Sequence, residues 1–181
     1  MGLETDFSLA KLDGRGSSTS LFTNFFANPV TQSVNAQQKT EWYGTLRGRV
    51  GWLARPNFLV FGTGGFAYGR VVDSANFAFG QAGTAVILPT IGGFSFNCPV
   101  NTTCFTGSSA ATRSGWTAGG GAEHLLDRHW SAKIEYQFVD LGTDTVRLTA
   151  VRANPGTTPS SFNVAFRERF NVVRVGLNYR F

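Results

Sequence analysis

Charged side chains in this sequence recur at every second position inside otherwise apolar stretches. If these stretches enclose a confined interior, their charges would either pair as salt bridges or line a selective constriction. Pairing is favoured, because an unpaired buried charge is strongly unfavourable. The predicted interior charge network consists of Glu4, Asp6, Arg47, Arg49, Glu123, Lys133, Glu135 and Arg174, with Arg180 on the same face of the last stretch.

Other patterns that could support catalysis are weak. The two histidines, His124 and His129, have no local carboxylate or serine pattern of a catalytic triad. A glycine cluster at 62–65 lacks the Lys-Ser/Thr of a phosphate loop, and glycine in a strand more often permits close packing. We therefore expect no enzyme activity, no cofactor and no metal site.

The two cysteines, Cys98 and Cys104, lie six positions apart in one segment. A zinc site is poorly supported because neither a second cysteine pair nor a nearby histidine is present. A local disulfide, which would fit an oxidising compartment, is favoured over two unrelated thiols.

The elements that would position these groups are strands. Side chains alternate between the two faces of a strand with period two, and six segments show apolar and polar residues in this alternation. They are 2–11, 41–53, 57–72, 115–126, 129–141 and 171–181.

The last segment has the clearest alternation. One face carries Val173, Val175, Leu177, Tyr179 and Phe181, and the other carries two arginines. In a transmembrane β-barrel the apolar face meets lipid and aromatic side chains gather at the interface. We therefore expect an outward position for a set of aromatic side chains, namely Trp42, Trp52, Trp116, Trp130, Tyr136, Tyr179 and Phe181.

The connections between the six segments differ in length. Two are short, at 54–57 and 127–128, whereas 12–40, 72–114 and 142–170 are long and are predicted as loops, although parts of 142–170 also alternate. Short turns at one end and long loops at the other are typical of outer-membrane barrels. The predicted fold class is all-β, an antiparallel up-and-down transmembrane β-barrel.

Composition limits the remaining possibilities. A length of 181 residues favours one domain, and charged residues make up only 15%. The net charge of +5 is spread without a basic run, so nucleic acid is not expected as a partner. No stretch is long and apolar enough for a transmembrane helix, and no secretory signal follows Met1.

At this point the chain resembles a known family. Segments 41–51, 64–71, 115–123, 130–136 and 173–181 are similar to the small eight-stranded outer-membrane proteins of the opacity-protein or porin-family type. The resemblance implies a single barrel domain over 1–181 in the outer membrane of a double-membrane bacterium. Segment 2–7 resembles the family's third strand, so six of eight strands would be present, without the signal peptide and the first two.

The resemblance also implies partners. Val175, Leu177, Tyr179 and Phe181 are similar to the terminal signal that such barrels present to the barrel assembly machinery. Outer-membrane lipid and lipopolysaccharide would surround the strands, and an unknown extracellular partner could bind the loops.

Three functions remain open. The leading hypothesis is a structural or surface-interaction barrel whose charged interior is plugged, since an eight-stranded barrel is just wide enough to be filled by side chains. A porin-like channel for small solutes is the first alternative. A soluble ligand-binding barrel of the lipocalin kind is the second, and it would need its apolar faces turned inward.

Overall fold

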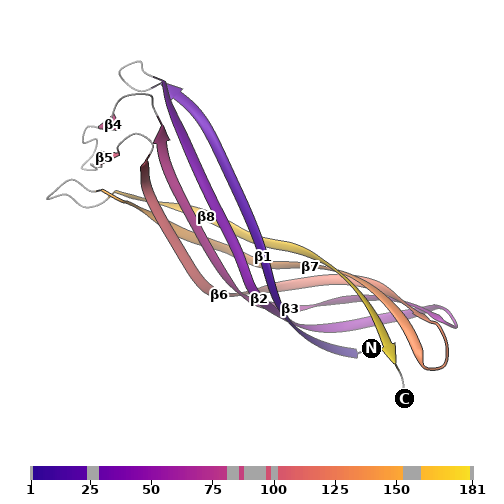
Figure 1. Cartoon of the computed structure of the whole chain (residues 1–181). Helices are drawn as coiled ribbons and strands as arrows, with labels where there is room; N and C mark the ends of the chain where they lie inside the picture. Colours follow the sequence, from indigo (N-terminus) through magenta and orange to yellow (C-terminus); the bar gives the residue numbers. More distant parts are fainter. Residues whose placement is uncertain are drawn as a thin grey trace.

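The protein is a single twisted antiparallel sheet of long strands, described by a computed structural model (Figure 1). The described residues are 2–23, 29–80, 86–87, 97–98, 102–152 and 160–179. The main sheet has the order β1-β2-β3-β6-β7-β8, and a small second sheet pairs β4 with β5. The main strands are β1 (Gly2–Thr23), β2 (Pro29–Arg55), β3 (Phe58–Gly80), β6 (Thr102–Leu125), β7 (Trp130–Ala150) and β8 (Ser161–Tyr179). The short strands are β4 (Val86–Ile87) and β5 (Asn97–Cys98).

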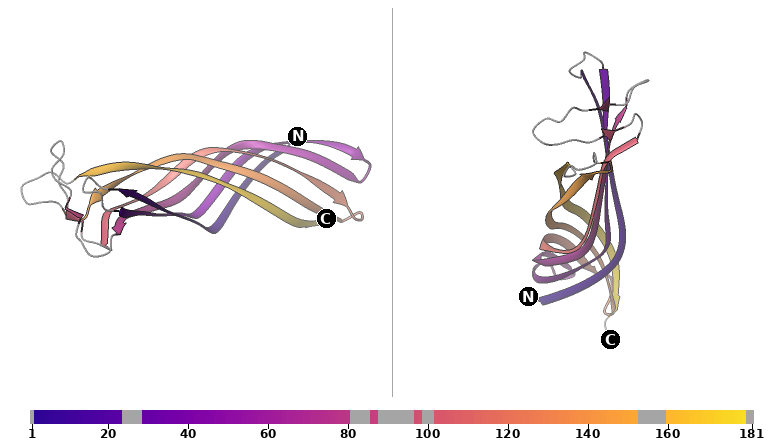
Figure 2. Two further views of the ribbon diagram at one scale, coloured as in Figure 1. Left: turned by 90° about the horizontal axis from the view of Figure 1, so that it is seen from above. Right: turned by 90° about the vertical axis from the view of Figure 1, so that its left-hand side faces the viewer.

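Each neighbouring pair in the main sheet is antiparallel, so consecutive strands run up and down. This arrangement confirms the predicted fold class. Both chain ends and the short turns, at 56–57 and 126–129, lie at one end of the sheet, which we call the turn end (Figures 1 and 2). The opposite end, where β1, β3 and β7 end and β2, β6 and β8 begin, we call the loop end.

The prediction of long loops was wrong for most of their length. The main strands have 19 to 27 residues, whereas a membrane-spanning β-strand needs about 9–11. Most of 12–40 belongs to β1 and β2, and most of 142–170 belongs to β7 and β8. Similarly, β3 and β6 extend far into 72–114. Outward-facing positions in these extensions are rich in serine, threonine, asparagine and glutamine, so the apolar–polar contrast that marks the other strand segments is weak.

The outer face of the turn-end half is apolar. Its exposed side chains form a band around the sheet, which we call the apolar belt: Leu3, Phe7, Leu46, Val50, Trp52, Val60, Phe66, Trp116, Trp130, Ile134, Tyr136, Val173, Val175, Leu177 and Tyr179. Nine residues of β7, Trp130 to Phe138, cross the belt, a rise of roughly 30 Å along the strand at about 3.4 Å per residue. A tilted strand of that length crosses the ~25 Å apolar band of a membrane barrel.

The predicted outward position of the aromatic side chains holds for the described ones. Trp52, Trp116, Trp130, Tyr136 and Tyr179 are exposed, and Trp42, partly covered, packs its ring against Phe7 and Tyr68 on the outer face. Phe181 lies outside the described residues. This inside-out arrangement excludes the soluble lipocalin-like alternative, whose apolar faces would have to be turned inward.

Irregularities in the strands coincide with the loop-side border of the belt. Pairing shifts between Leu9 and Leu12 in β1, between Thr40 and Trp42 in β2, and between Asp140 and Gly142 in β7. Gly142 has a φ of 86°, which favours glycine, and its N–H donates to Asp140 Oδ1 at 2.9 Å. These bulges bend the strands where the membrane-spanning part ends.

Beyond that border the sheet divides into two wings. The β6–β7 ladder pairs Trp116 with Asp140 and Thr106 with Thr149, and no pairing joins the described residues between them. Figure 1 shows β7 and β8 separating from the other four strands beyond the border, and the two groups meet again near the loop end, where the Val151 N–H donates to the Cys104 carbonyl oxygen at 2.8 Å. We call β1-β2-β3-β6 the first wing and β7-β8 the second wing. In the described part of the chain, no helix is both long and apolar enough to cross a membrane.

Candidate functional site

The eight residues of the predicted charge network lie together on the inner face at the level of the belt. They come from five strands: Glu4 and Asp6 from β1, Arg47 and Arg49 from β2, Glu123 from β6, Lys133 and Glu135 from β7, and Arg174 from β8. Period-two alternation places them inward because their strand neighbours belong to the apolar belt. Ion pairs link all eight into one connected set.

Arg47 is the centre of this network. Its side chain is only 1% exposed, and it makes close ion pairs with Asp6 and with Glu135, which is also 1% exposed. Its guanidinium also lies 3.4 Å from Glu4 Oε2 and donates to Thr63 Oγ1 at 3.3 Å. Because β2 and β7 are not neighbours in the sheet, the Arg47–Glu135 pair spans the interior.

A second set of contacts surrounds Arg49. Its guanidinium bridges Glu4 and Glu123 at 2.9 Å each, and it stacks over the Phe61 ring with 3.7 Å from Cζ to the centroid. Glu123 accepts further hydrogen bonds from Ser131 at 2.7 Å and Asn178 at 3.3 Å. Sequence analysis assigned no role to Phe61, whose ring serves as a cation–π platform.

The remaining members join β7 and β8 to β1. Lys133 Nζ lies 3.0 Å from Glu135 Oε2 and 3.8 Å from Glu4 Oε1. Arg174 pairs with Asp6 at 3.1 Å and donates to the Tyr43 hydroxyl at 3.1 Å. Four acidic and four basic groups therefore balance, and opposite charges in contact offset much of the cost of removing them from water.

Apolar residues form a layer above the network toward the loop end. Tyr43, Ala67, Val71, Val139 and Leu141 are buried there, with Phe170 and Val172 packed against them. A second buried cluster lies farther along, between the wings, and contains Ala75, Cys104, Phe105, Val146, Leu148, Ala150 and Phe166. This second cluster explains why the strands continue past the membrane: their inner face is apolar even though their outer face is polar.

Between the two apolar layers lies a smaller polar cluster that sequence reasoning missed. Thr40 Oγ1 donates to Glu168 Oε1 at 2.5 Å, and Asp73, which is 1% exposed, faces Glu168 and Arg113. Arg113 itself pairs closely with Asp144 of β7 across the divided ladder. Burial, followed by the charge of Glu168, raises the pKa of Asp73 to about 6.

The other predicted site residues are less completely described. Val175, Leu177 and Tyr179 lie on the exposed face of β8, whereas Arg180 and Phe181 lie outside the described residues, so the assembly signal stays a prediction. Cys104 is buried and disulfide-bonded. The Cys98 side chain lies outside the described residues, and the Cys98–Cys104 pairing also stays a prediction. No cluster of metal-ligating side chains occurs among the residues that the structure describes.

Comparisons with known proteins agree with this architecture. A family model described as "Outer membrane protein beta-barrel domain" matches residues 1–181. The chain is 33% identical over its whole length to the 31 kDa outer-membrane immunogenic protein of Brucella melitensis, and to that of Brucella suis. It is 25% identical over 86% of its length to a 22 kDa outer membrane protein of Rhizobium leguminosarum. The chain spans 59% of the Brucella proteins and 54% of the Rhizobium protein. No solved structure matches it.

Proposed function

The chain belongs to the outer-membrane protein β-barrel domain family and is located in the outer membrane of a Gram-negative bacterium, and from this we propose that it is a surface-interaction barrel with a plugged interior. In this function, the apolar belt anchors the protein in lipid and the charge network fills its lumen. The loop-end wings then project outside the cell, where they are available to a binding partner.

One observation carries the proposal. Arg47 and Glu135 meet across the interior from strands that are not neighbours, and both are almost completely buried. A water-filled pore would leave such charges hydrated, whereas a plugged interior requires them to pair. Charge balance within the network supports the same conclusion, because ion-selective constrictions usually carry rings of one sign.

Conductance of the natural full-length protein in planar bilayers tests the plug. We expect no stable single-channel steps. Replacing Arg47 and Glu135 together with alanine should produce conducting openings. The matched control is the outward pair Arg70 and Glu41, joined at 3.1 Å on the outer surface, whose double alanine variant should stay silent. Stable single-channel conductance steps from the wild-type protein would overturn the proposal that the interior is plugged.

A porin-like channel is the second candidate function. It is supported by the two edge strands, β1 and β8, which do not pair with each other in the described chain. Any further strands between these edges would widen the interior. The same conductance measurement separates the two functions.

The name of the Brucella relatives describes them as immunogenic, which supports the proposal that the wings of this chain also reach the cell surface. Labelling of single cysteines on intact cells tests this. Thr145→Cys, on the exposed face of the second wing, should react with a membrane-impermeant maleimide. Arg55→Cys at the turn end should react only after the outer membrane is permeabilised. The reverse pattern would invert the proposed orientation.

A further inference from the structure

The outer face of the first wing carries an unusually regular set of polar side chains. Two cross-strand rows run over all four strands: Arg15, Gln37, Ser74 and Ser108 pair in one, and Ser17, Asn35, Asn76 and Thr106 pair in the other. We call these eight residues the polar face. Their strand neighbours Ala36 and Ala75 pack into the inner apolar cluster, so period two directs the polar face outward.

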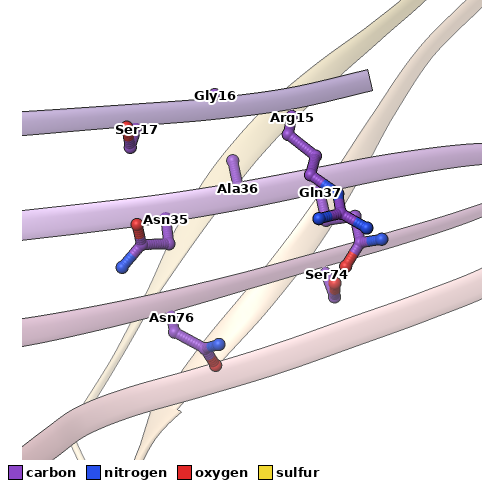
Figure 3. Close-up of a pocket in the computed structure, with 8 residues that line it drawn as sticks. All are labelled: Arg15, Gly16, Ser17, Asn35, Ala36, Gln37, Ser74 and Asn76. Atoms are coloured by element: carbon purple, nitrogen blue, oxygen red, sulfur yellow. The ribbon is translucent and has the colours of Figure 1, made fainter. Parts of the chain in front are cut away.

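The polar face is hollowed and its hydrogen-bonding groups are available. A shallow concavity of about 380 Å³ is lined by six of these residues together with Gly16 and Ala36, and Figure 3 shows the Arg15 guanidinium lying beside Gln37. In the described part of the chain, the one side-chain hydrogen bond within the polar face joins Thr106 Oγ1 to Asn76 Oδ1 at 2.8 Å. The amides of Asn35 and Gln37 and the hydroxyls of Ser74 and Ser108 are therefore free to bind a ligand.

The chemistry of the outer surface changes in a defined order along the first wing. The last apolar side chains before the border are Trp42 and Tyr68, whose rings pack together on the outer surface. A charged band follows, in which Glu41 binds Arg70 at 3.1 Å and Lys39 at 3.9 Å. The polar face comes next, and it contains one arginine and no carboxylate. Moving outward from the membrane centre, a lipopolysaccharide molecule presents acyl chains, then phosphates, then sugars, and each layer would meet matching side chains.

We propose that the polar face binds the core oligosaccharide of a lipopolysaccharide molecule in the same leaflet. Amide and hydroxyl side chains pair with sugar hydroxyls, and Arg15 pairs with a phosphate or carboxylate on the sugar. The lipid-anchored source is favoured because the face points sideways, toward neighbouring lipid, and is continuous with the belt. This inference rests on the proposed function only in requiring that the wings stand outside the membrane.

Binding of purified lipopolysaccharides to the full-length protein in phospholipid nanodiscs free of lipopolysaccharide tests the proposal. The probes are lipopolysaccharide with a complete core, lipid A without core sugars, and the released soluble core oligosaccharide. We expect wild-type protein to bind the complete form at least several-fold more tightly than lipid A. The triple variant Asn35→Ala, Gln37→Ala, Asn76→Ala should lose at least about tenfold in affinity for the complete form, because it removes the groups for three net hydrogen bonds, and it should bind lipid A unchanged.

The matched control lies on the exposed face of the second wing. Thr143→Ala, Thr145→Ala, Asn163→Ala removes three exposed polar side chains that are not paired with the polar face, and it should bind the complete form within twofold of wild type. Heat-modifiable electrophoretic mobility checks that every variant is folded. Equal affinity of wild type and the polar-face variant would overturn the proposal. Equal affinity for the soluble core oligosaccharide and the complete form would overturn the lipid-anchored source. Conductance and surface labelling test the proposed function separately. A failure of that function can therefore be told apart from a failure of lipopolysaccharide binding at the polar face.

Discussion

At the scale of single residues, Arg47 is the group on which the interior depends most. Replacing Arg47 with leucine would leave Glu135 buried without its central partner. Breaking a buried ion pair from one side costs about 3–5 kcal/mol, so we expect the free energy of unfolding in detergent to fall by that amount. Arg55→Leu, at an exposed turn-end position, should change it by less than about 0.5 kcal/mol. Equal effects of the two variants would mean that the network adds no stability.

Asp73 should lower the free energy of unfolding as pH rises, whereas the carboxylates responsible for ordinary acid denaturation lower it as pH falls. Its folded-state pKa of about 6 lies above the ordinary aspartate pKa of 3.8, so between these two pH values the folded protein holds a proton that the unfolded chain releases. Stability from this group is fully present below pH 4 and is lost as pH rises through 6. Asp73→Asn removes the titration while keeping the shape. The groups that face Asp73 are Glu168, Arg113 and Gln38, with Asp144 held by Arg113.

The measurement is the urea midpoint of wild type and Asp73→Asn at pH 4 and pH 7.5. We expect similar midpoints at pH 4 and a higher midpoint for the variant at pH 7.5, where the wild type carries two facing carboxylates. Asp13→Asn is a suitable control, because Asp13 is exposed on β1. A variant less stable than wild type at pH 7.5 would show that Asp73 acts as the partner of Arg113 and not as a repelled carboxylate.

At the scale of strands, close packing between neighbours depends on inward glycines. A Cβ built on Gly65 would lie 2.1 Å from the carbonyl oxygen of Leu46, whereas one on Gly48 would meet its nearest atom, the Gly64 carbonyl oxygen, at 3.9 Å. Gly65→Ala should therefore force β2 and β3 apart and lower the free energy of unfolding by about 1–3 kcal/mol. Gly48→Ala, on a neighbouring strand, should be nearly neutral. Denaturant unfolding in detergent compares the two directly.

The terminal residues of β8 are predicted to act in assembly and not in stability. Deleting Phe181 from the full-length protein should lower the yield in the outer membrane several-fold, while the assembled fraction keeps its unfolding midpoint. This prediction is based on the outward-facing side chains of Val175, Leu177 and Tyr179. It is also based on the resemblance of this segment to the terminal signal that such barrels present to the barrel assembly machinery. Phe181→Tyr keeps an aromatic end and should retain most of the yield. Equal yields for the deletion and the parent would contradict this role.

The sequence predicted the strands where their two faces differ chemically. Residues such as Trp130, Ile134 and Tyr136 alternate with charged ones because one face meets lipid and the other meets the interior. The same reasoning failed above the belt, where water replaces lipid and outward positions such as Asn35 and Ser74 become polar. In that region the inward positions are still apolar, as at Val146 and Leu148, but the outward positions no longer form a contrasting lipid-facing pattern. The electrostatic influence of Glu168 on Asp73 could not be predicted from the sequence either, because it depends on the inter-strand register.

At the scale of the whole molecule, the two edge strands determine whether residues 1–181 can form a stable membrane protein. β1 and β8 end the main sheet, and in the described chain each has a neighbour on one side. Arg174 on β8 reaches Asp6 and Ser8 on β1, but these side-chain contacts leave the backbone edges unpaired. In lipid each unsatisfied backbone group costs several kcal/mol, so both edges need a partner, either in further strands of the same polypeptide or in another copy of the chain.

Residues 1–181 expressed alone should therefore misassemble or aggregate, whereas the same residues within the natural full-length protein should give a heat-modifiable, protease-resistant barrel. Refolding both into detergent and lipid vesicles, followed by gel mobility and protease digestion, compares them. Size measurement of the refolded species separates the two ways of satisfying the edges, because additional strands of the same polypeptide give monomers and pairing between copies gives oligomers. A monomeric, inserted and protease-resistant product from residues 1–181 alone would show that β1 and β8 close on each other in the membrane.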